Sequence, residues 1–291
     1  MSRRGNRTAA ARELTLRKFD ITSVPDDSVI VFVGKRQTGK SFLVRDLLFY
    51  KQDIPVGTVV SGTEGANEFY SKIVPKSFIH GEYDESITER VLERQKRVVA
   101  DMKRESRSLG GTDIDPRAIY LLDDCLYDKS WTRSKVVRSL FMNGRHWKIM
   151  FLITMQYSLG IPPNLRTNVD YVFILRESII QNRRRLYDAY AGMFPTFDMF
   201  CRVMDECTED YHCLVIHTNA KSNKLTDMVF WYKASPHAAF RFGHPSFWDY
   251  AATAAPDTDD DDDYGAGGAS SSSSSSGLVR KGDYLGRIRR R

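Results

Sequence analysis

One short segment constrains the fold of this chain more than any other. Residues 29–33 form an apolar run, and the pattern G-x-x-x-x-G-K-S follows at residues 34–41. The run predicts a buried strand, and residues 42–50 predict a helix that begins directly after the pattern. In such a strand–loop–helix unit, glycines let successive backbone N–H groups converge on a phosphate, and the helix N-terminus adds partial positive charge. The segment therefore predicts a phosphate-binding loop (P-loop).

The side chains of this loop have the chemistry that a nucleoside triphosphate requires. Lys40 is expected to reach the β- and γ-phosphates, and the hydroxyl of Ser41 is expected to hold Mg²⁺. The residues expected to bind the nucleotide are Gly34, Lys35, Arg36, Gln37, Thr38, Gly39, Lys40, Ser41 and Phe42. We therefore expect the chain to bind a nucleoside triphosphate together with Mg²⁺.

Strand and helix patterns alternate through the chain as far as about residue 250. Further strands are expected at residues 56–62, 77–80, 118–124, 148–154 and 169–175, and further helices at 87–108, 130–144, 178–191 and 197–207. Two last strands, at 211–218 and 227–233, surround a polar turn and indicate a hairpin. This alternation predicts an α/β fold: a mostly parallel central sheet with helices on both faces and a C-terminal β-hairpin.

The composition changes towards both ends of the chain. Residues 1–25 form a basic N-terminal lead-in, residues 26–250 the P-loop domain, and residues 251–291 a tail with Asp and Ser runs and a basic end. Because such a tail buries too little apolar area to offset chain entropy, we expect it to be disordered. No apolar run approaches the roughly 18 residues of a membrane-spanning helix, so no transmembrane segment is expected.

The charge and the cysteines leave some classes of site open. The net charge is +6, and arginines cluster at both ends of the chain and at residues 183–185. Such clusters fit nucleic acid binding and fit a solvated surface equally well. Cys201, Cys207 and Cys213 lie near two histidines, but they lack the C-x-x-C pairs of structural zinc. Reduced, buried thiols of an intracellular protein are the preferred interpretation.

Two carboxylates end the apolar strand expected at residues 118–124, and a glutamine ends the next strand. Asp123 is expected to hold Mg²⁺ through water, as a Walker B aspartate does, and Asp124 to orient the attacking water. Gln156 can contact both the γ-phosphate and that water, and so sense whether the nucleotide is intact. These three positions predict hydrolysis in addition to phosphate binding.

Hydrolysis also needs positive charge on the transition state. Arg166 lies in a loop or short helix just before the strand expected at residues 169–175. In a ring-forming ATPase, an arginine in this place can project into the site of the adjacent subunit as an arginine finger. Arg176, at the far end of the same strand, is the competing candidate.

These motifs occur in an order that resembles a known family. The chain resembles the poxvirus-type genome-packaging ATPases of nucleocytoplasmic large DNA viruses, a branch of the FtsK–HerA superfamily. The resemblance rests on the order of its motifs: a strand, G-x-x-x-x-G-K-S, apolar-Asp-Asp, a strand ending in Gln, and P-x-N-L-R-T-N-V-D. The resemblance covers about residues 29–175 and is expected to extend to the hairpin. It implies a RecA-like core, dependence on ATP and Mg²⁺, a homo-oligomeric and hexameric ring, and double-stranded DNA driven into a preformed capsid.

The resemblance also implies roles for residues and partners. By motif position it assigns Lys40 and Ser41 to Walker A, Asp123 to the metal, Asp124 to catalysis, Gln156 to sensing and Arg166 to the finger. FtsK-like motors generally have glutamate where this chain has Asp124. Candidate DNA-gripping residues are Lys103, Arg104 and Arg107, or Arg133, Lys135 and Arg138. Capsid or membrane-vertex proteins are further expected partners, and the expected location is the virion and the host-cell cytoplasm at virus assembly sites.

Two other functions fit the sequence. A P-loop kinase acting on a small substrate would need an arginine-rich lid, which residues 183–185 can supply. Gln156 at the end of the strand after Asp123 suits a water-activating ATPase better. A non-catalytic virion assembly protein would use ATP as a structural ligand, and Asp124 argues against it.

Overall fold

The computed structural model describes residues 15–125, 129–156 and 160–254. The strands of this part are β1 (Arg17–Lys18), β2 (Val29–Val33), β3 (Val56–Ser61), β4 (Ile79–His80), β5 (Ala118–Asp123), β6 (Ile149–Met155), β7 (Tyr171–Ile174), β8 (His212–His217) and β9 (Val229–Lys233). Its α-helices are α1 (Lys40–Tyr50), α2 (Glu64–Asn67), α3 (Glu85–Leu109), α4 (Lys135–Asn143), α5 (Pro163–Arg166), α6 (Ile180–Tyr190), α7 (Phe197–Cys207), α8 (Leu225–Met228) and α9 (Pro245–Ala254).

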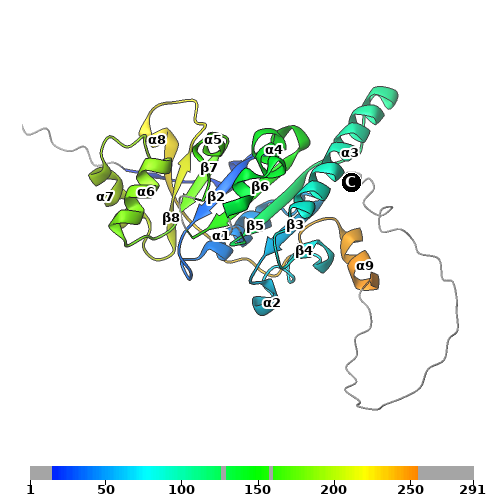
Figure 1. Ribbon diagram of the computed structural model, residues 1–291, viewed down its shortest axis with the longest axis horizontal. Helices are drawn as coiled ribbons and strands as arrows, with labels where there is room; N and C mark the ends of the chain where they lie inside the picture. The colour runs from blue at the N-terminus through cyan, green and yellow to red at the C-terminus, as the bar shows by residue number, and fades with distance from the viewer. Residues whose placement is uncertain (1–14, 126–128, 157–159, 255–291) are drawn as a thin grey trace, which may run out of the picture.

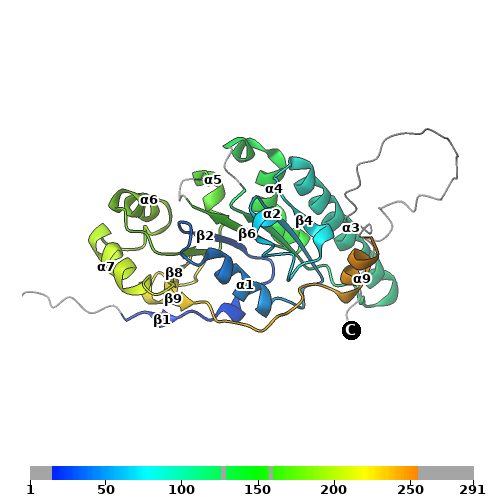
Figure 2. The same cartoon turned by 90° about the horizontal axis from the view of Figure 1, so that it is seen from below.

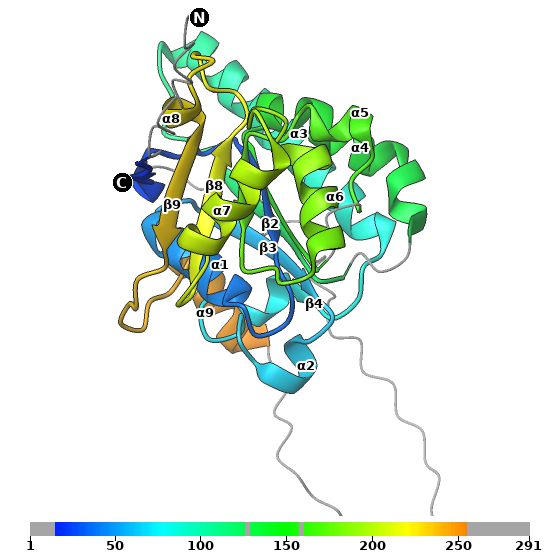
Figure 3. The ribbon, with the colours of Figure 1, turned by 90° about the vertical axis from the view of Figure 1, so that its left-hand side faces the viewer.

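All of these strands belong to one sheet with the order β1-β9-β8-β7-β2-β6-β5-β3-β4 (Figure 1). Among the described strands, β8 alone runs antiparallel to its neighbours, β7 and β9. Figure 3 shows β8 and β9 on one side of β2, and β3 and β4 on the other. The predicted mostly parallel α/β sheet with a C-terminal antiparallel pair is confirmed.

Helices cover both faces of this sheet (Figure 2). Helix α1 packs on one face through Leu43 and Leu47, while α3, α4 and α6 pack on the other through residues such as Leu92, Leu140 and Leu186. Every residue of β2, β5 and β6 is buried. Strands buried on both sides are continuous apolar runs, which is why the sequence pattern located them.

Side chains set the ends of the main helices. At the start of α3, Asp84 accepts a hydrogen bond from the Ser86 N–H, and Gly110 in a left-handed conformation ends the helix. Ser134 caps α4 in the same way by accepting from the Val137 N–H. The helix predicted at residues 130–144 was therefore too long at its start, where the 3₁₀ turn Lys129–Arg133 precedes the cap.

The ordered domain begins earlier than the predicted boundary at residue 26. Strand β1 pairs with β9, and the Phe19 N–H donates to the Trp231 carbonyl at 2.8 Å. Ile21 and Val24 are buried in the core beside α1. The few apolar residues of this segment stand among charged ones, so the composition predicted a basic lead-in with no more than a possible short segment at residues 13–21. Residues 1–14 and 255–291 lie outside the described residues, and the disorder of the tail stays a prediction.

Two classes of site considered from the sequence can be compared with this fold. Cys213 lies in β8, and burial raises the pKa of its thiol. Within the described ranges, no group of three or more His, Cys, Asp or Glu side chains is arranged to hold a metal ion. None of the helices there combines the length and apolar character needed to cross a membrane.

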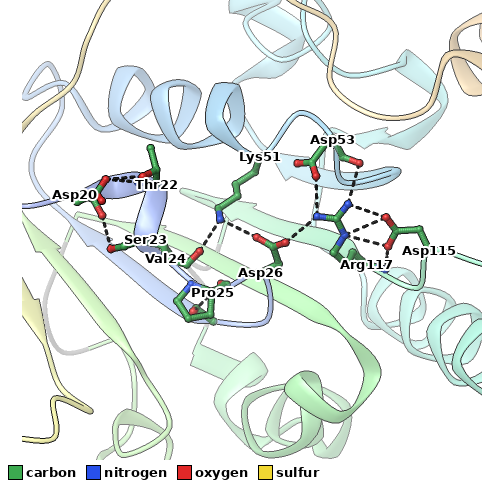
Figure 4. A network of polar contacts seen from close by, with 11 residues as sticks. Asp20, Thr22, Ser23, Val24, Pro25, Asp26, Lys51, Asp53, Asp115 and Arg117 are labelled. Carbon is green, nitrogen blue, oxygen red and sulfur yellow. Dashed lines mark hydrogen bonds and ion pairs between the residues drawn. The ribbon is translucent and has the colours of Figure 1, made fainter. Parts of the chain in front are cut away.

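A charge network fixes the amino edge of the sheet, opposite the phosphate-binding loop (Figure 4). Arg117, directly before β5, donates through Nη1 to Asp26 and Asp53 at 2.8 Å each. Its Nη2 donates to the buried Asp115 at 2.7 Å, and Lys51 at the end of α1 donates to Asp26 at 2.7 Å. Burial alone would raise the pKa of Asp26, but the hydrogen bonds and charges of Lys51 and Arg117 outweigh it and hold that pKa below its usual value.

Replacing Arg117 with alanine should lower the free energy of unfolding by about 3 kcal/mol, because buried Asp115 loses its ion pair with Arg117 and half-buried Asp26 keeps Lys51 but loses Arg117. Urea denaturation at pH 7 measures this loss. Arg104→Ala is the matched control: Arg104 is 70% exposed on α3, and its loss should change stability by no more than about 0.5 kcal/mol.

The effect should also depend on pH in one direction. Because folding lowers the pKa of Asp26, its contribution is present above the unfolded pKa of about 3.9 and is lost as the pH falls through the folded pKa. The difference between wild type and Arg117→Ala should therefore shrink below about pH 4. A difference that grows under acid conditions would contradict the network.

Candidate active site

The loop between β2 and α1 is closed tightly, and its glycines allow this. Gly39, before α1, has a φ of 99°. A Cβ added at Gly34 would lie 2.7 Å from Thr38 Oγ1 and 2.9 Å from Leu175 Cβ, so a side chain does not fit there. Gln37 is also left-handed, with a φ of 62°, a conformation that is uncommon outside glycine. The backbone thus forms a preorganised cradle of the kind that binds phosphate.

Lys40 lies inside this cradle. It begins α1, two residues earlier than the predicted helix, and it is only 6% exposed. Its Nζ donates to the carbonyl oxygens of Gly34 at 2.6 Å and Lys35 at 3.2 Å, and it lies 3.4 Å from Asp124 Oδ2. In this structure the ammonium group of Lys40 donates to these protein oxygens; with a nucleotide bound, the same N–H donors would bind phosphate oxygens instead. Ser41 follows in the first turn of α1 and is half-buried.

Asp123 ends β5 between polar side chains of the two neighbouring strands. The register places it opposite Ser61 of β3 and Thr154 of β6. Thr154 Oγ1 donates to Asp123 Oδ1 at 2.6 Å, and Ser61 Oγ donates to Oδ2 at 3.2 Å. Burial raises the pKa of Asp123 by more than the Thr154 hydrogen bond lowers it, and Asp124 adds to the rise. A divalent cation would offset both effects, so the site fits Mg²⁺.

Asp124 and Gln156 meet beside Lys40. Gln156 Nε2 donates at 3.3 Å to Asp124 Oδ2, the oxygen that also lies near Lys40 Nζ. Asp124 has a φ of 47°, and its N–H donates to Thr154 Oγ1 at 3.0 Å. Such strained backbone persists where surrounding contacts fix it, and it clusters at functional sites. Because β6 lies between β2 and β5, the sheet brings together all four of the predicted residues Lys40, Asp123, Asp124 and Gln156.

Arg166 lies at the amino edge of the sheet, where the parallel strands begin. Its carbonyl accepts from the Val169 N–H, and Asp170, which follows, bonds to both backbone groups of Val29 at the start of β2. The phosphate-binding loop is at the opposite end of β2, so the structure does not bring Arg166 to the loop of its own chain. Arg176 is exposed just beyond the carboxyl end of β7, at the loop's edge.

Several residues of the site were missed by the sequence analysis. Ser61 ends the apolar strand β3, and Thr154 is the last residue but one of β6; a polar residue at or near the end of an apolar strand was the available signal. Glu177 had none: its side chain is 8% exposed, lies 2.7 Å from Lys35 Nζ and accepts from the Ile179 N–H at 2.8 Å. Burial alone would raise the pKa of Glu177, but the Lys35 and backbone hydrogen bonds hold it below its usual value. The contact ties the loop to the start of α6.

Sequence comparison identifies relatives in large DNA viruses. No protein-family model matches the chain. The uncharacterized protein 075L of Invertebrate iridescent virus 6 is 47% identical over 197 residues, which cover 67% of this chain and 72% of that protein. The uncharacterized protein L437 of Acanthamoeba polyphaga mimivirus is 38% identical over 235 residues, which cover 80% of this chain and 82% of that protein.

Structural comparison identifies the fold. The genome packaging NTPase B204 from Sulfolobus turreted icosahedral virus 2, in complex with sulfate, superposes with a TM-score of 0.51 at 15% identity. The match covers 74% of this chain and 100% of that chain, and it identifies the α/β sheet as a RecA-like P-loop NTPase fold. The chain therefore belongs to the family of nucleocytoplasmic large DNA virus proteins that includes 075L and L437, and it has the RecA-like P-loop fold.

Proposed function

We propose that this protein is an ATP-hydrolysing translocase that packages double-stranded DNA into viral capsids. The observation that carries the proposal is the meeting of Lys40, Asp124 and Gln156 at one carboxylate oxygen, next to the buried Asp123. A site built only to hold phosphate needs the loop and its lysine. The additional carboxylate and amide are groups that position water for attack on a terminal phosphate.

Each residue of this group has a distinct task in the proposed reaction. Lys40 binds oxygens of the terminal phosphates, and Ser41 and Asp123 would hold Mg²⁺, which when bound supplies positive charge against the phosphate oxygens. Asp124 orients the attacking water and takes up its proton. Gln156 holds the Asp124 carboxylate through its amide and reports whether a terminal phosphate is present.

Arg166 is proposed to act on the site of a neighbouring subunit. In a head-to-tail ring, the amino edge of one sheet can face the carboxyl edge of the next. The Arg166 side chain lies over the Tyr190 ring, with Cζ 5.9 Å from the ring centre, and its buried Nε has no hydrogen-bond partner among the described residues. A guanidinium that rests on an aromatic ring at the amino edge of the sheet is proposed to serve as the arginine finger of a hexameric homo-oligomer.

The remaining partners are proposed on chemical grounds. A packaging motor must be indifferent to sequence, so DNA contacts should be made mainly to phosphates. The candidates are all exposed: Lys103, Arg104 and Arg107 lie on α3, Arg133 ends the 3₁₀ turn before α4, and Lys135 and Arg138 lie in α4. Capsid or membrane-vertex proteins, in the virion and at cytoplasmic assembly sites, are the further proposed partners.

The kinase alternative is disfavoured by the arginines that would form its lid. Arg183 Nη2 donates to Asp205 at 2.6 Å and its Nε donates to the Glu177 carbonyl at 2.6 Å. Arg184 lies over the Phe197 ring, 3.6 Å from its centre. Two of the three lid candidates therefore hold α6 against α7 and the loop before α6. ATP hydrolysis that duplex DNA stimulates, with no phosphorylated small product, would identify the translocase and exclude the kinase. Measuring the mass of the assembly with nucleotide present would give the number of subunits in the ring.

Asp124→Asn should lower ATP turnover at least about 100-fold while ATP binding changes little, because the amide cannot accept the proton of the water. Asparagine tolerates the left-handed backbone of this position, so the loop should keep its shape. Phosphate release and calorimetric titration measure the two effects. Asp188→Asn, exposed on α6, is the control and should act as wild type. Unchanged turnover in Asp124→Asn would instead favour a non-catalytic role.

Arg166→Ala should bind ATP normally but lose turnover by about 1,000-fold, the scale of a missing arginine finger. Lys40→Ala should lose tight ATP binding. Mixing the two inactive variants should restore activity, because interfaces then occur in which an intact loop faces an intact Arg166. Absence of any recovery in assembled mixtures would contradict a finger acting between subunits.

A further inference from the structure

An exposed tyrosine lies against the phosphate-binding loop. Tyr211 is 67% exposed, and a Cβ built on Gly39 would lie 3.4 Å from its ring atom Cδ1. Tyr211 directly precedes β8, which runs antiparallel to β7. The start of β8 is therefore at the carboxyl edge of the parallel strands, the edge where α/β sheets bind their ligands.

The backbone holds this tyrosine outward at a conformational cost. Asp210 has a φ of 48° and Tyr211 a φ of 60°, so two successive non-glycine residues are left-handed. The turn is fixed by Lys233 Nζ, which donates to Asp210 at 2.6 Å, and by the His212 N–H, which donates to the Glu209 carbonyl at 2.9 Å. Burial of Tyr211 does not offset the strain, because the residue is mostly exposed. Strain that persists around an exposed side chain points to a binding role.

The order of strands determines which way a bound nucleotide extends. Lys40 Nζ lies 3.4 Å from Asp124, so the terminal phosphate belongs on the β6 and β5 side of β2. Strands β7 and β8 lie on the other side of β2, and Figure 3 shows β8 on that side. With its phosphates along the loop, the nucleotide has its nucleoside end on the β7 and β8 side, where Tyr211 stands next to Gly39.

We propose that Tyr211 stacks on the base of the nucleoside triphosphate. The inference rests on the proposed function, since it requires a nucleotide in this loop. An aromatic ring face gives affinity to every base, because each base has a π-face. The larger ring system of a purine covers more of the tyrosine, so ATP and GTP should be preferred to CTP and UTP. Stacking alone does not discriminate adenine from guanine.

Binding titrations with Mg²⁺ test this, using ATP, CTP and inorganic tripolyphosphate, which has no base. Tyr211→Ala should weaken ATP binding by about 5- to 100-fold and reduce the preference for ATP over CTP, while tripolyphosphate binding stays unchanged. Tyr211→Phe, which keeps the ring, should bind as wild type. Leu109→Ala is the control, because Leu109 is 74% exposed at the end of α3.

The outcomes separate the inference from the function on which it rests. If Tyr211→Ala weakens ATP and tripolyphosphate equally, or weakens neither, stacking is overturned and the ATPase proposal stands. If Tyr211→Phe loses affinity as Tyr211→Ala does, the hydroxyl and not the ring is responsible, and stacking is again overturned. If wild type binds neither ATP nor tripolyphosphate, the proposed function fails and the inference fails with it.

Discussion

The site depends on three parallel strands whose carboxyl ends lie in one register. Strand β6 pairs with β2 on one side and β5 on the other, so Thr154 lies opposite both Phe32 and Asp123. This pairing places a strand-end carboxylate within reach of a lysine from a different strand–helix unit. The amino ends of the same strands are held by Arg117 and Asp170. A shift of one residue in any pair would turn the polar side chains to the other face of the sheet.

Buried charge is concentrated where the proposed chemistry needs it. Asp123 and Lys40 are both buried; Asp123 accepts a hydrogen bond from Thr154 on the neighbouring strand, and Lys40 donates to carbonyl oxygens of the loop. Ionised groups that lose water in this way have stronger electrostatic interactions with a ligand than exposed groups have. Gln37 and Asp124, two of the left-handed non-glycine residues, belong to the same region. The carboxyl edge of the sheet therefore combines buried charge with left-handed backbone, and the amino edge holds the ion-pair network of Arg117.

Much of this arrangement was accessible from the sequence. Unbroken apolar runs identified the central strands, and a polar residue directly after such a run identified Asp123, Asp124 and Gln156. Glu177 and Tyr211 were not found as site residues, because their contacts arise from strand order, which brings together residues far apart in the chain. Strand β1 was hidden by its two charged residues, which pair at the sheet edge with their side chains exposed. Position in the sheet, and not local pattern, decided these cases.

The distance of Arg166 from its own phosphate-binding loop has a consequence for when the protein hydrolyses ATP. Under the proposed function, a free subunit can bind nucleotide but lacks the arginine of a neighbouring subunit that hydrolysis requires. Such a subunit binds nucleotide without hydrolysing it at an appreciable rate. ATP hydrolysis begins when subunits assemble, so the hydrolysis rate reports how many subunits have a neighbour in place. An arginine at the amino edge would thus confine ATP hydrolysis to the assembled ring.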